Sequence, residues 1–145
     1  MGDRIFLDTN ILVYSYEQSA DPRYAVAREL ILRCFRGEVS FVISNQVLAE
    51  FFQVITCKSK FPLSKTEARQ LISFLIECNS WTKVDYTHTT LLEATSISHQ
   101  YNISIWDALI AATMVEHNIH IIYTENEADF RKVPLLKVVN PFKKN

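Results

Sequence analysis

The chain has 145 residues, a formal net charge of −1 and a hydrophobic content of 48%, with a mean hydropathy of +0.02. This length fits one globular domain over residues 1–145, and the composition excludes disordered, fibrous and low-complexity chains. The balanced charge gives no overall basic field for nucleic-acid binding, although a local basic patch stays compatible with it. Three widely spaced cysteines predict reduced thiols. No apolar run is long enough for a membrane span, so we expect a soluble, cytoplasmic protein without a membrane partner.

The first half of the chain is predicted to alternate strands with helices. The short apolar run at residues 5–7 predicts a buried strand, and a short helix follows at residues 11–16. Apolar residues at helical spacing predict a helix over residues 25–35. Residues 39–43 are β-branched and aromatic, which predicts a second strand. A helix beginning at Ser44 is expected to run toward residue 56.

The second half continues the alternation. Ser64 and Glu67 have the spacing of a capping box and open a predicted helix. The further predicted elements, in chain order, are a short strand at 81–84, helices at 87–101 and 105–117, and strands at 119–123 and 136–139. Strands separated by helices imply right-handed crossovers. The predicted fold class is therefore α/β, in three layers (α/β/α) around a mainly parallel central sheet.

The first acid of interest stands at a predicted strand end. Asp8 directly follows the first strand, and ligands of open α/β sheets bind beyond the carboxyl ends of the strands. The alternative is local, because Asp8 or Asn10 could simply cap the following helix.

Two further acids lie on predicted helices. Glu50 falls within the apolar stripe that contains Val47 and Val54, so its charge needs a cation, an arginine or a water-filled cleft. A salt bridge or a position at the edge of the stripe would also explain it. Asp107 has an apolar helix face around it, although Ser104 and Asp107 together also fit a capping box.

An acid-rich loop follows the strand predicted at 119–123. It contains Glu125, Glu127 and Asp129, which a solvated turn would also explain. Acids from four places are nevertheless expected to meet at one edge of the sheet. Their mutual repulsion is relieved by divalent ions, and a cluster of oxygen ligands without His or Cys favours Mg²⁺ or Mn²⁺.

Five segments, in this order, carry a resemblance to a known family. They are Phe-Leu-Asp-Thr-Asn-Ile-Leu (6–12), Ile-Ser-Asn-Gln-Val-Leu-Ala-Glu-Phe (43–51), Trp-Asp-Ala-Leu-Ile-Ala-Ala (106–112), Tyr-Thr-Glu-Asn (123–126) and Val-Asn-Pro-Phe (139–142). The chain resembles the PIN-domain ribonucleases, most closely the VapC toxins of toxin–antitoxin pairs. The resemblance implies Mg²⁺- or Mn²⁺-dependent endonucleolytic cleavage of RNA, in which water attacks the phosphodiester bond and leaves 5′-phosphate and 3′-hydroxyl ends.

The resemblance also assigns positions. Asp8, Glu50 and Asp107 match the three core acids, which implies that they bind metal and are catalytic. A fourth acid is frequent in the family where this chain has Asn126, whose carbonyl could still serve as a ligand. The loss of one charge there weakens a second metal site, and Asp129, Glu125 or Glu127 could compensate. The polar residues that match supporting positions are Thr9, Asn10, Ser44 and Thr124.

The resemblance further implies an RNA substrate, a cognate antitoxin protein and a homodimer. Tyr14 and Tyr16 could stack on unpaired bases or pack inside the protein. One of Phe51 and Phe52 is expected to be exposed and to suit a dimer or antitoxin interface. The basic candidates for contacts with the RNA backbone are Lys58, Lys60, Lys65, Arg131, Lys132, Lys143 and Lys144.

Other functions remain as alternatives or are excluded. The presence of Asn126 keeps open a catalytically weak or inactive PIN-like scaffold that binds RNA or a protein partner. A phosphoaspartate receiver would need a second acid beside Asp8, and a haloacid-dehalogenase-type phosphatase would need an aspartate where Asn10 stands. With only Gly2 and Gly37 present, no glycine-rich phosphate loop or nucleophile elbow exists.

Overall fold

Five short strands form one sheet in the computed structural model, which describes residues 3–143. They are β1 (Arg4–Leu7), β2 (Ser40–Ser44), β3 (Thr82–Val84), β4 (Ile121–Tyr123) and β5 (Lys137–Val139). Their order in the sheet is β3-β2-β1-β4-β5, and every neighbouring pair is parallel. The central strands are continuously apolar because helices cover both faces of the sheet.

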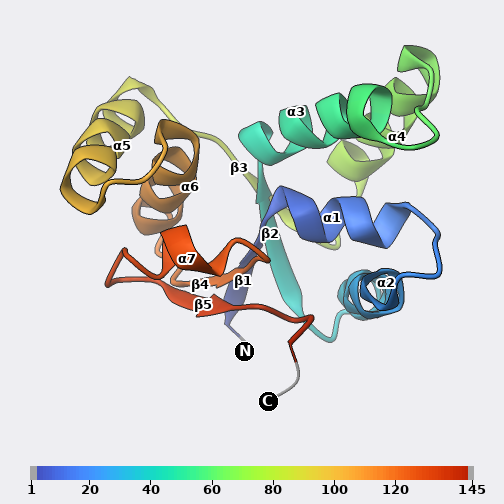
Figure 1. The fold of residues 1–145 in the computed structure, drawn as a ribbon, viewed down its shortest axis with the longest axis horizontal. Helices are drawn as coiled ribbons and strands as arrows, with labels where there is room; N and C mark the ends of the chain where they lie inside the picture. The colour runs from blue at the N-terminus through green and yellow to red at the C-terminus, as the bar shows by residue number, and fades with distance from the viewer. Residues whose placement is uncertain (1–2, 144–145) are drawn as a thin grey trace.

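The helices divide between the two faces of this sheet. They are α1 (Thr9–Tyr16), α2 (Pro22–Phe35), α3 (Asn45–Gln53), the π-helical segment η1 (Val54–Lys58), α4 (Lys65–Glu77), α5 (His88–Tyr101), α6 (Ile105–Glu116) and α7 (Glu127–Phe130). Helices α1 to α4 lie on one side, where α1 packs on α2 and α3, while α5 and α6 pack together on the other (Figure 1). The predicted three-layer α/β/α architecture is confirmed. Within the described range, no helix has the length and apolar character needed to cross a membrane.

Local signals set most helix ends where the sequence predicts them. The Ser64–Glu67 capping box is complete, and Asn118 adopts the left-handed conformation after α6, with φ 57°. The helix predicted over 44–56 differs, because α3 ends at Gln53 and the chain continues as η1. In η1 the Thr56 hydroxyl donates to the Phe52 carbonyl at 2.8 Å, a side-chain bond to the preceding turn that competes with regular helix geometry.

The connections create a switch point between β1 and β4. The chain leaves β1 through α1 and α2 on one face and enters β4 from α5 and α6 on the other face (Figure 1). At the carboxyl ends of these adjacent strands, the Asp8 amide donates to the Tyr123 carbonyl at 3.1 Å. Parallel α/β sheets bind ligands at such a point, so the fold brings Asp8 to the edge where a site is expected.

Candidate active site

Asp8 lies at the centre of a buried hydrogen-bond network. Its Oδ1 accepts the Thr9 amide at 2.8 Å, which makes it the N-cap of α1. Its Oδ2 accepts the Thr124 hydroxyl at 2.7 Å and the Asn10 amide group at 3.3 Å. The side chain is only 6% exposed, and this burial raises the pKa of the carboxyl, as does the nearby charge of Glu50, while the Thr124 hydrogen bond lowers it. Asp8 therefore serves both roles, because Oδ1 caps α1 and Oδ2 faces the polar side chains of the site.

Glu50 faces this cluster from the middle of α3. Its Oε2 accepts the Thr9 hydroxyl at 3.0 Å, and its Oε1 accepts the Gln46 amide group at 2.7 Å. The carboxylate forms no ion pair with any lysine, arginine or histidine of residues 3–143, so the salt-bridge alternative is wrong. The charge of Glu50 is instead held at an open cleft by neutral hydrogen-bond donors.

Asp107 enters from the first turn of α6. Its amide donates to Ser104 Oγ at 3.2 Å, which is one half of the predicted capping box. The other half is not formed, since the carboxylate turns to the Asn126 amide group, 3.1 Å from Oδ2. Burial, followed by the charges of Asp8 and Asp129, raises the pKa of Asp107 to about 6. A structural cap alone would not place this carboxyl against two others.

Asn126 occupies the position for which the sequence resemblance implies a fourth acid. Its amide group donates to Asp107 Oδ2 and also to Asp129 Oδ2, at 3.1 and 3.4 Å, and its backbone amide donates to Thr124 Oγ1 at 2.9 Å. Asn126 therefore bridges two carboxylates by hydrogen bonds. Of the three acids that could compensate for its missing charge, Asp129 is the one placed beside it.

The other two acids of this loop are engaged elsewhere. Glu125 pairs with Arg23 at 2.8 Å and accepts the Tyr14 hydroxyl at 3.1 Å. Glu127 pairs with Arg131 at 2.8 Å and with Lys143 at 2.5 Å, and these hydrogen bonds lower its pKa to about 2. Both carboxylates thus have their charge compensated locally, unlike the acids of the cluster.

The predicted supporting residues take different places. Thr9, Asn10 and Thr124 each donate a hydrogen bond directly to an acid of the cluster. Ser44 is buried and accepts the Val47 amide at 3.2 Å, as the N-cap of α3. Ser44 therefore acts on Glu50 only through the start of the helix that carries it.

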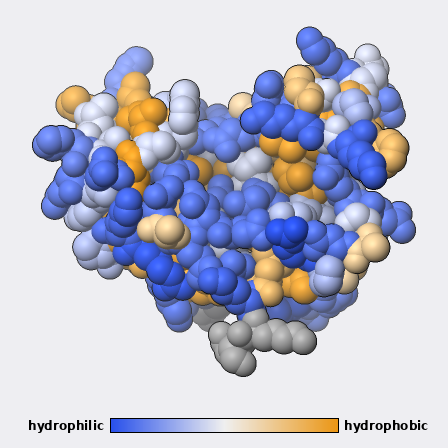
Figure 2. Space-filling model, viewed as in Figure 1, coloured by the Kyte–Doolittle hydropathy of each residue, from blue (hydrophilic) through white to orange (hydrophobic). Residues whose placement is uncertain are grey.

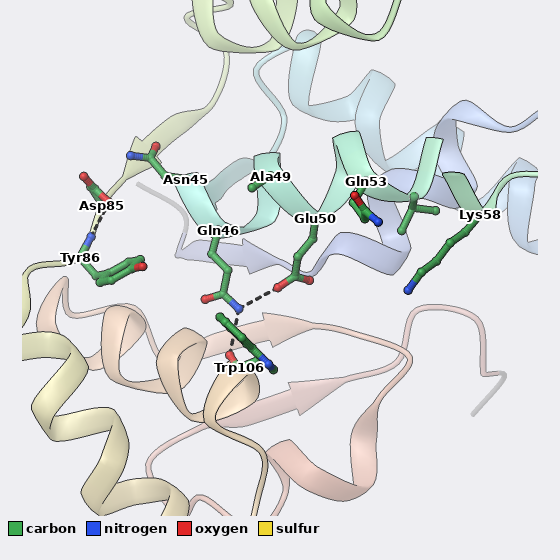
Figure 3. Close-up of a pocket in the computed structure, with 10 residues that line it drawn as sticks. Asn45, Gln46, Ala49, Glu50, Gln53, Lys58, Asp85, Tyr86 and Trp106 are labelled. Carbon is green, nitrogen blue, oxygen red and sulfur yellow. Dashed lines mark hydrogen bonds between the residues drawn. The ribbon is translucent and has the colours of Figure 1, made fainter. Parts of the chain in front are cut away.

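A cleft of about 780 Å³ is lined in part by Glu50 (Figure 3). It lies between α3–η1, the segment before α5 and the start of α6, and its lining residues are Asn45, Gln46, Ala49, Glu50, Gln53, Val54, Lys58, Asp85, Tyr86 and Trp106. The space-filling view shows the outline dipping between the α5 side and the α3–α4 side (Figure 2). Gln46 and Trp106 are absent from the sequence prediction. Both residues lie in segments that carry the family resemblance, and Gln46 precedes Glu50 by one helical turn.

The aromatic contact candidates Phe51, Phe52 and Tyr14 pack against the rest of the protein. Phe51 is buried and Phe52 is partly buried against the core, so the expected exposed aromatic at this pair is wrong. Tyr14 is held by Glu125 and lies under the Arg23 guanidinium, 4.6 Å from its ring centroid.

The basic candidates separate into two groups. Arg131 and Lys143 are bound to Glu127, and Lys132 lies 3.7 Å from Asp129. These side chains balance the acid-rich loop and do not form a free basic patch, while Lys144 lies outside the described residues. The remaining candidates, Lys58, Lys60 and Lys65, are exposed, and Lys58 lines the cleft.

The donor set fits a hard divalent cation. Asp8, Glu50 and Asp107 present carboxylate oxygens, and in the described part of the chain no basic side chain pairs with any of them. No three Asp, Glu, His or Cys side chains of residues 3–143 already surround a single point. Instead, Glu50 accepts a hydrogen bond from Gln46, and Asp107 accepts one from Asn126. The remaining uncompensated charge and the oxygen ligands are those that Mg²⁺ or Mn²⁺ prefers.

The raised pKa of Asp107 predicts a pH-dependent cost to stability. The folded pKa is about 6 against an ordinary value of 3.8, so the folded state is destabilised above pH 6 and gains stability as pH falls toward 4. In EDTA, Asp107→Asn should raise the melting temperature at pH 8 by roughly 2–4 °C, or about 1 kcal/mol after allowance for partial exposure. Calorimetry across pH 5–8 checks this. A gain that does not shrink below pH 6 would contradict it.

Comparison with known proteins identifies the family. A model of the PIN domain matches residues 5–136. The chain belongs to the PIN domain family. A search of curated proteins with this chain found no match. The identification from sequence motifs is thereby confirmed, and the acid cluster lies within the matched PIN domain.

Solved structures share this PIN fold over nearly the whole chain. VapBC-1 from nontypeable Haemophilus influenzae matches with TM-score 0.69 and 19% identity, covering 97% of this chain and 99% of that one. VapBC2 from Rickettsia felis, bound to a DNA fragment from its promoter, gives 0.67 and 23%, covering 94% and 98%. Mycobacterium tuberculosis VapC20, a sarcin–ricin loop cleaving toxin, gives 0.69 and 17%, covering 89% and 95%. At these identities the likeness establishes the fold.

Proposed function

We propose that this PIN-domain protein is a divalent-metal-dependent endoribonuclease and the toxin of a toxin–antitoxin pair. The observation that carries the proposal is the group Asp8, Glu50 and Asp107, three carboxylates without basic partners at the switch point of the sheet. Stability alone gives no reason for this group, because buried or crowded carboxylates cost free energy. A site that binds a cation and a phosphodiester does give one.

The residues that would hold Mg²⁺ or Mn²⁺ are Asp8, Glu50 and Asp107, with Asn126 or Asp129 at the fourth position. A divalent ion bound there offsets the charge of the phosphate, lowers the pKa of a water molecule and stabilises the leaving oxygen. Thr124 and Thr9 hold the first two carboxylates in place by donating hydroxyl hydrogens. These hydrogen bonds set the orientation of the two carboxylates.

No side-chain nucleophile is required by this arrangement. Within residues 3–143, Cys34 is buried among core residues and Ser44 is committed to capping α3. Thr9 and Thr124 already donate their hydroxyl hydrogens to carboxylates. Water is therefore the proposed attacking group, which leaves a 5′-phosphate and a 3′-hydroxyl on the RNA.

The direct test is cleavage of a pool of structured RNAs by purified protein with Mg²⁺, Mn²⁺ or EDTA. We expect cleavage with either metal, none in EDTA and recovery when Mg²⁺ is restored, with 5′-phosphate ends on the products. Cleavage that persists in EDTA would contradict the proposal. The proposal would also be contradicted if calorimetry shows that Mn²⁺ binds but no RNA in the pool is cut. For this result, any copurified protein is first released by heating.

The proposal that the protein is a toxin is supported by the solved structures that share its fold. Several of its solved relatives are toxin–antitoxin complexes, among them one from Klebsiella pneumoniae at 20% identity and TM-score 0.66. We propose a cognate antitoxin protein and a homodimer as partners, acting in the cytoplasm where RNA substrates lie. Growth arrest on expression, relieved by co-expression of the cognate antitoxin, is the expected result.

A second candidate function has one observation in its favour. Asn126 stands where a fourth acid is frequent, and its uncharged amide group donates hydrogen bonds to the carboxylates of Asp107 and Asp129. This arrangement favours weaker metal binding and hence a PIN-like scaffold that binds RNA or a protein without cutting. Metal binding and cleavage by the variant Asn126→Asp separate the two functions.

A further inference from the structure

The cleft beside the acids carries an exposed aromatic side chain that the stability of the fold does not explain. Trp106 is 63% exposed although it directly precedes Asp107, whereas the other tryptophan, Trp81, is 3% exposed and donates its ring N–H to the Leu75 carbonyl at 2.8 Å. Exposure of a large indole ring to water at the mouth of a cleft is energetically unfavourable, and it leaves the ring available for binding.

The backbone of Trp106 is bound by the same residue that holds Glu50. The Gln46 amide group donates to Glu50 Oε1 at 2.7 Å and to the Trp106 carbonyl at 3.0 Å, so it joins α3 to the start of α6 (Figure 3). The backbone that carries the indole therefore lies at a set position relative to Glu50. A ligand group resting on this ring would be adjacent to the proposed reacting phosphate.

The rest of the cleft has the chemistry of a nucleotide site. Tyr86 adds a second aromatic ring, and Asn45 and Gln53 add amide groups that can pair with the edge of a base. Lys58 reaches into the cleft from η1, beyond Glu50 as seen from Trp106 (Figure 3), where it can offset a backbone phosphate. A volume of about 780 Å³ lies in the range of small-ligand sites.

We propose that this cleft is a base-binding subsite that receives an unpaired nucleotide of the RNA next to the scissile phosphate, with Trp106 as its stacking surface. The inference rests on the proposed RNA cleavage, and it specifies the substrate as single-stranded or looped RNA at the cut. A base-paired nucleotide does not expose its face to an indole, so a continuous duplex is excluded at this position. Tyr14 and Tyr16, the stacking candidates from the sequence, are not among the residues that line the cleft.

The two tryptophans make the subsite measurable without cleavage. A base that stacks on an indole quenches its fluorescence, and Trp81 is too buried to respond. Titration of the protein with short oligoadenylate in EDTA should quench the emission in wild type and in Trp81→Phe, and should not quench it in Trp106→Phe. A ribose-phosphate backbone of equal length without bases should give no quenching in any of them.

Binding measured by a labelled oligoadenylate gives the size of the effect. Trp106→Ala should weaken binding about 10-fold, within the factor of roughly 5 to 150 that one base–aromatic stack contributes, and Trp106→Phe should recover most of it. Phe61→Ala is the matched control, because Phe61 is 80% exposed but lies outside the cleft, and its binding should equal wild type. Unchanged melting temperatures would show that the variants are folded.

The outcomes separate this inference from the proposed function. The protein could cleave RNA in Mg²⁺ while oligoadenylate does not quench Trp106 and binds Trp106→Ala as tightly as wild type. The proposed subsite would then be wrong, and the proposed ribonuclease activity would stand. If Trp106 is quenched by bases but no RNA is cut, the subsite stands and the scaffold function replaces the enzyme. Quenching of Trp106 by rising protein concentration alone would overturn the subsite in favour of a contact between two copies of the chain.

Discussion

Asp8→Asn should reduce metal-dependent RNA cleavage by at least about 10²–10³-fold while leaving the protein folded. The substitution removes one charge from the centre of the cluster and keeps the size of the side chain. The carbonyl oxygen of the introduced amide can still accept the Thr9 amide at the start of α1, so the local backbone should not change. Single-turnover cleavage in Mg²⁺, measured beside wild type, gives the size of the loss.

The effect of Asp8→Asn on stability results from two opposing terms. Loss of a buried charge is favourable, since burial raises the pKa of Asp8. However, Oδ2 now accepts from both Thr124 and Asn10, and an amide nitrogen in its place would put donors against donors. We therefore expect the melting temperature in EDTA to stay within roughly 3 °C of wild type, equivalent to about 1 kcal/mol.

A matched control makes this result specific. Asp3→Asn is the same chemical change at an exposed residue before β1, at the opposite end of the strand, and should leave cleavage unchanged. Added Mn²⁺ should raise the melting temperature of wild type and of Asp3→Asn, because a ligand that binds only the folded state stabilises it. An Asp8→Asn protein that cleaves normally, with the same metal requirement, would refute the role of Asp8 as a metal ligand.

The meeting of Asp8 with Thr124 was predictable because it follows from topology. Asp8 ends β1, Thr124 ends β4, and parallel strands bring their carboxyl ends to one edge, so residues far apart in sequence meet there. Glu50 was detectable as a charge within an apolar stripe, and Asp107 as an acid on a buried helix. In each case a regular element carries the residue, so periodicity gives its direction.

The surroundings of the cluster were less predictable because they depend on loops and on contacts between elements. Nothing local to Trp106 shows that its ring is left in solvent, since a helical apolar pattern predicts burial equally well. The pairing of Lys143 with Glu127 requires the end of the chain to return to the loop after β4. The change from α3 to the π-helical η1 keeps the chain helical, and apolar periodicity does not distinguish the two kinds of helix.

Asn126→Asp should strengthen binding of Mn²⁺ by roughly 10–100-fold and raise cleavage at low Mg²⁺. At present the Asn126 amide group donates to Asp107 and Asp129, which lowers the pKa of Asp107. A carboxylate in its place adds a negative charge and a strong oxygen ligand, and it exchanges two hydrogen bonds for two repulsions. Calorimetric titration with Mn²⁺ at pH 7.5 measures the change in affinity.

The same variant should be less stable without metal and should recover with it. In EDTA its melting temperature should fall by several degrees, since three carboxylates would then lie against one another, and Mn²⁺ should restore it. Asn79→Asp is the control. Asn79 is exposed before β3, at the amino end of the sheet, so this substitution adds the same charge far from the cluster. Equal Mn²⁺ affinity in wild type, Asn126→Asp and Asn79→Asp would show that position 126 lies outside the metal site.

The cleavage assay of Asn126→Asp also decides between the two proposed functions. An active wild type that becomes more active at low Mg²⁺ identifies a ribonuclease whose affinity for metal is limited by a neutral fourth position. An inactive wild type and an active variant would mean that one amide group, by occupying Asp107 and Asp129, keeps a complete set of acids from holding metal. The protein would then be the RNA- or protein-binding scaffold, since every other contact of the cluster is unchanged by this substitution.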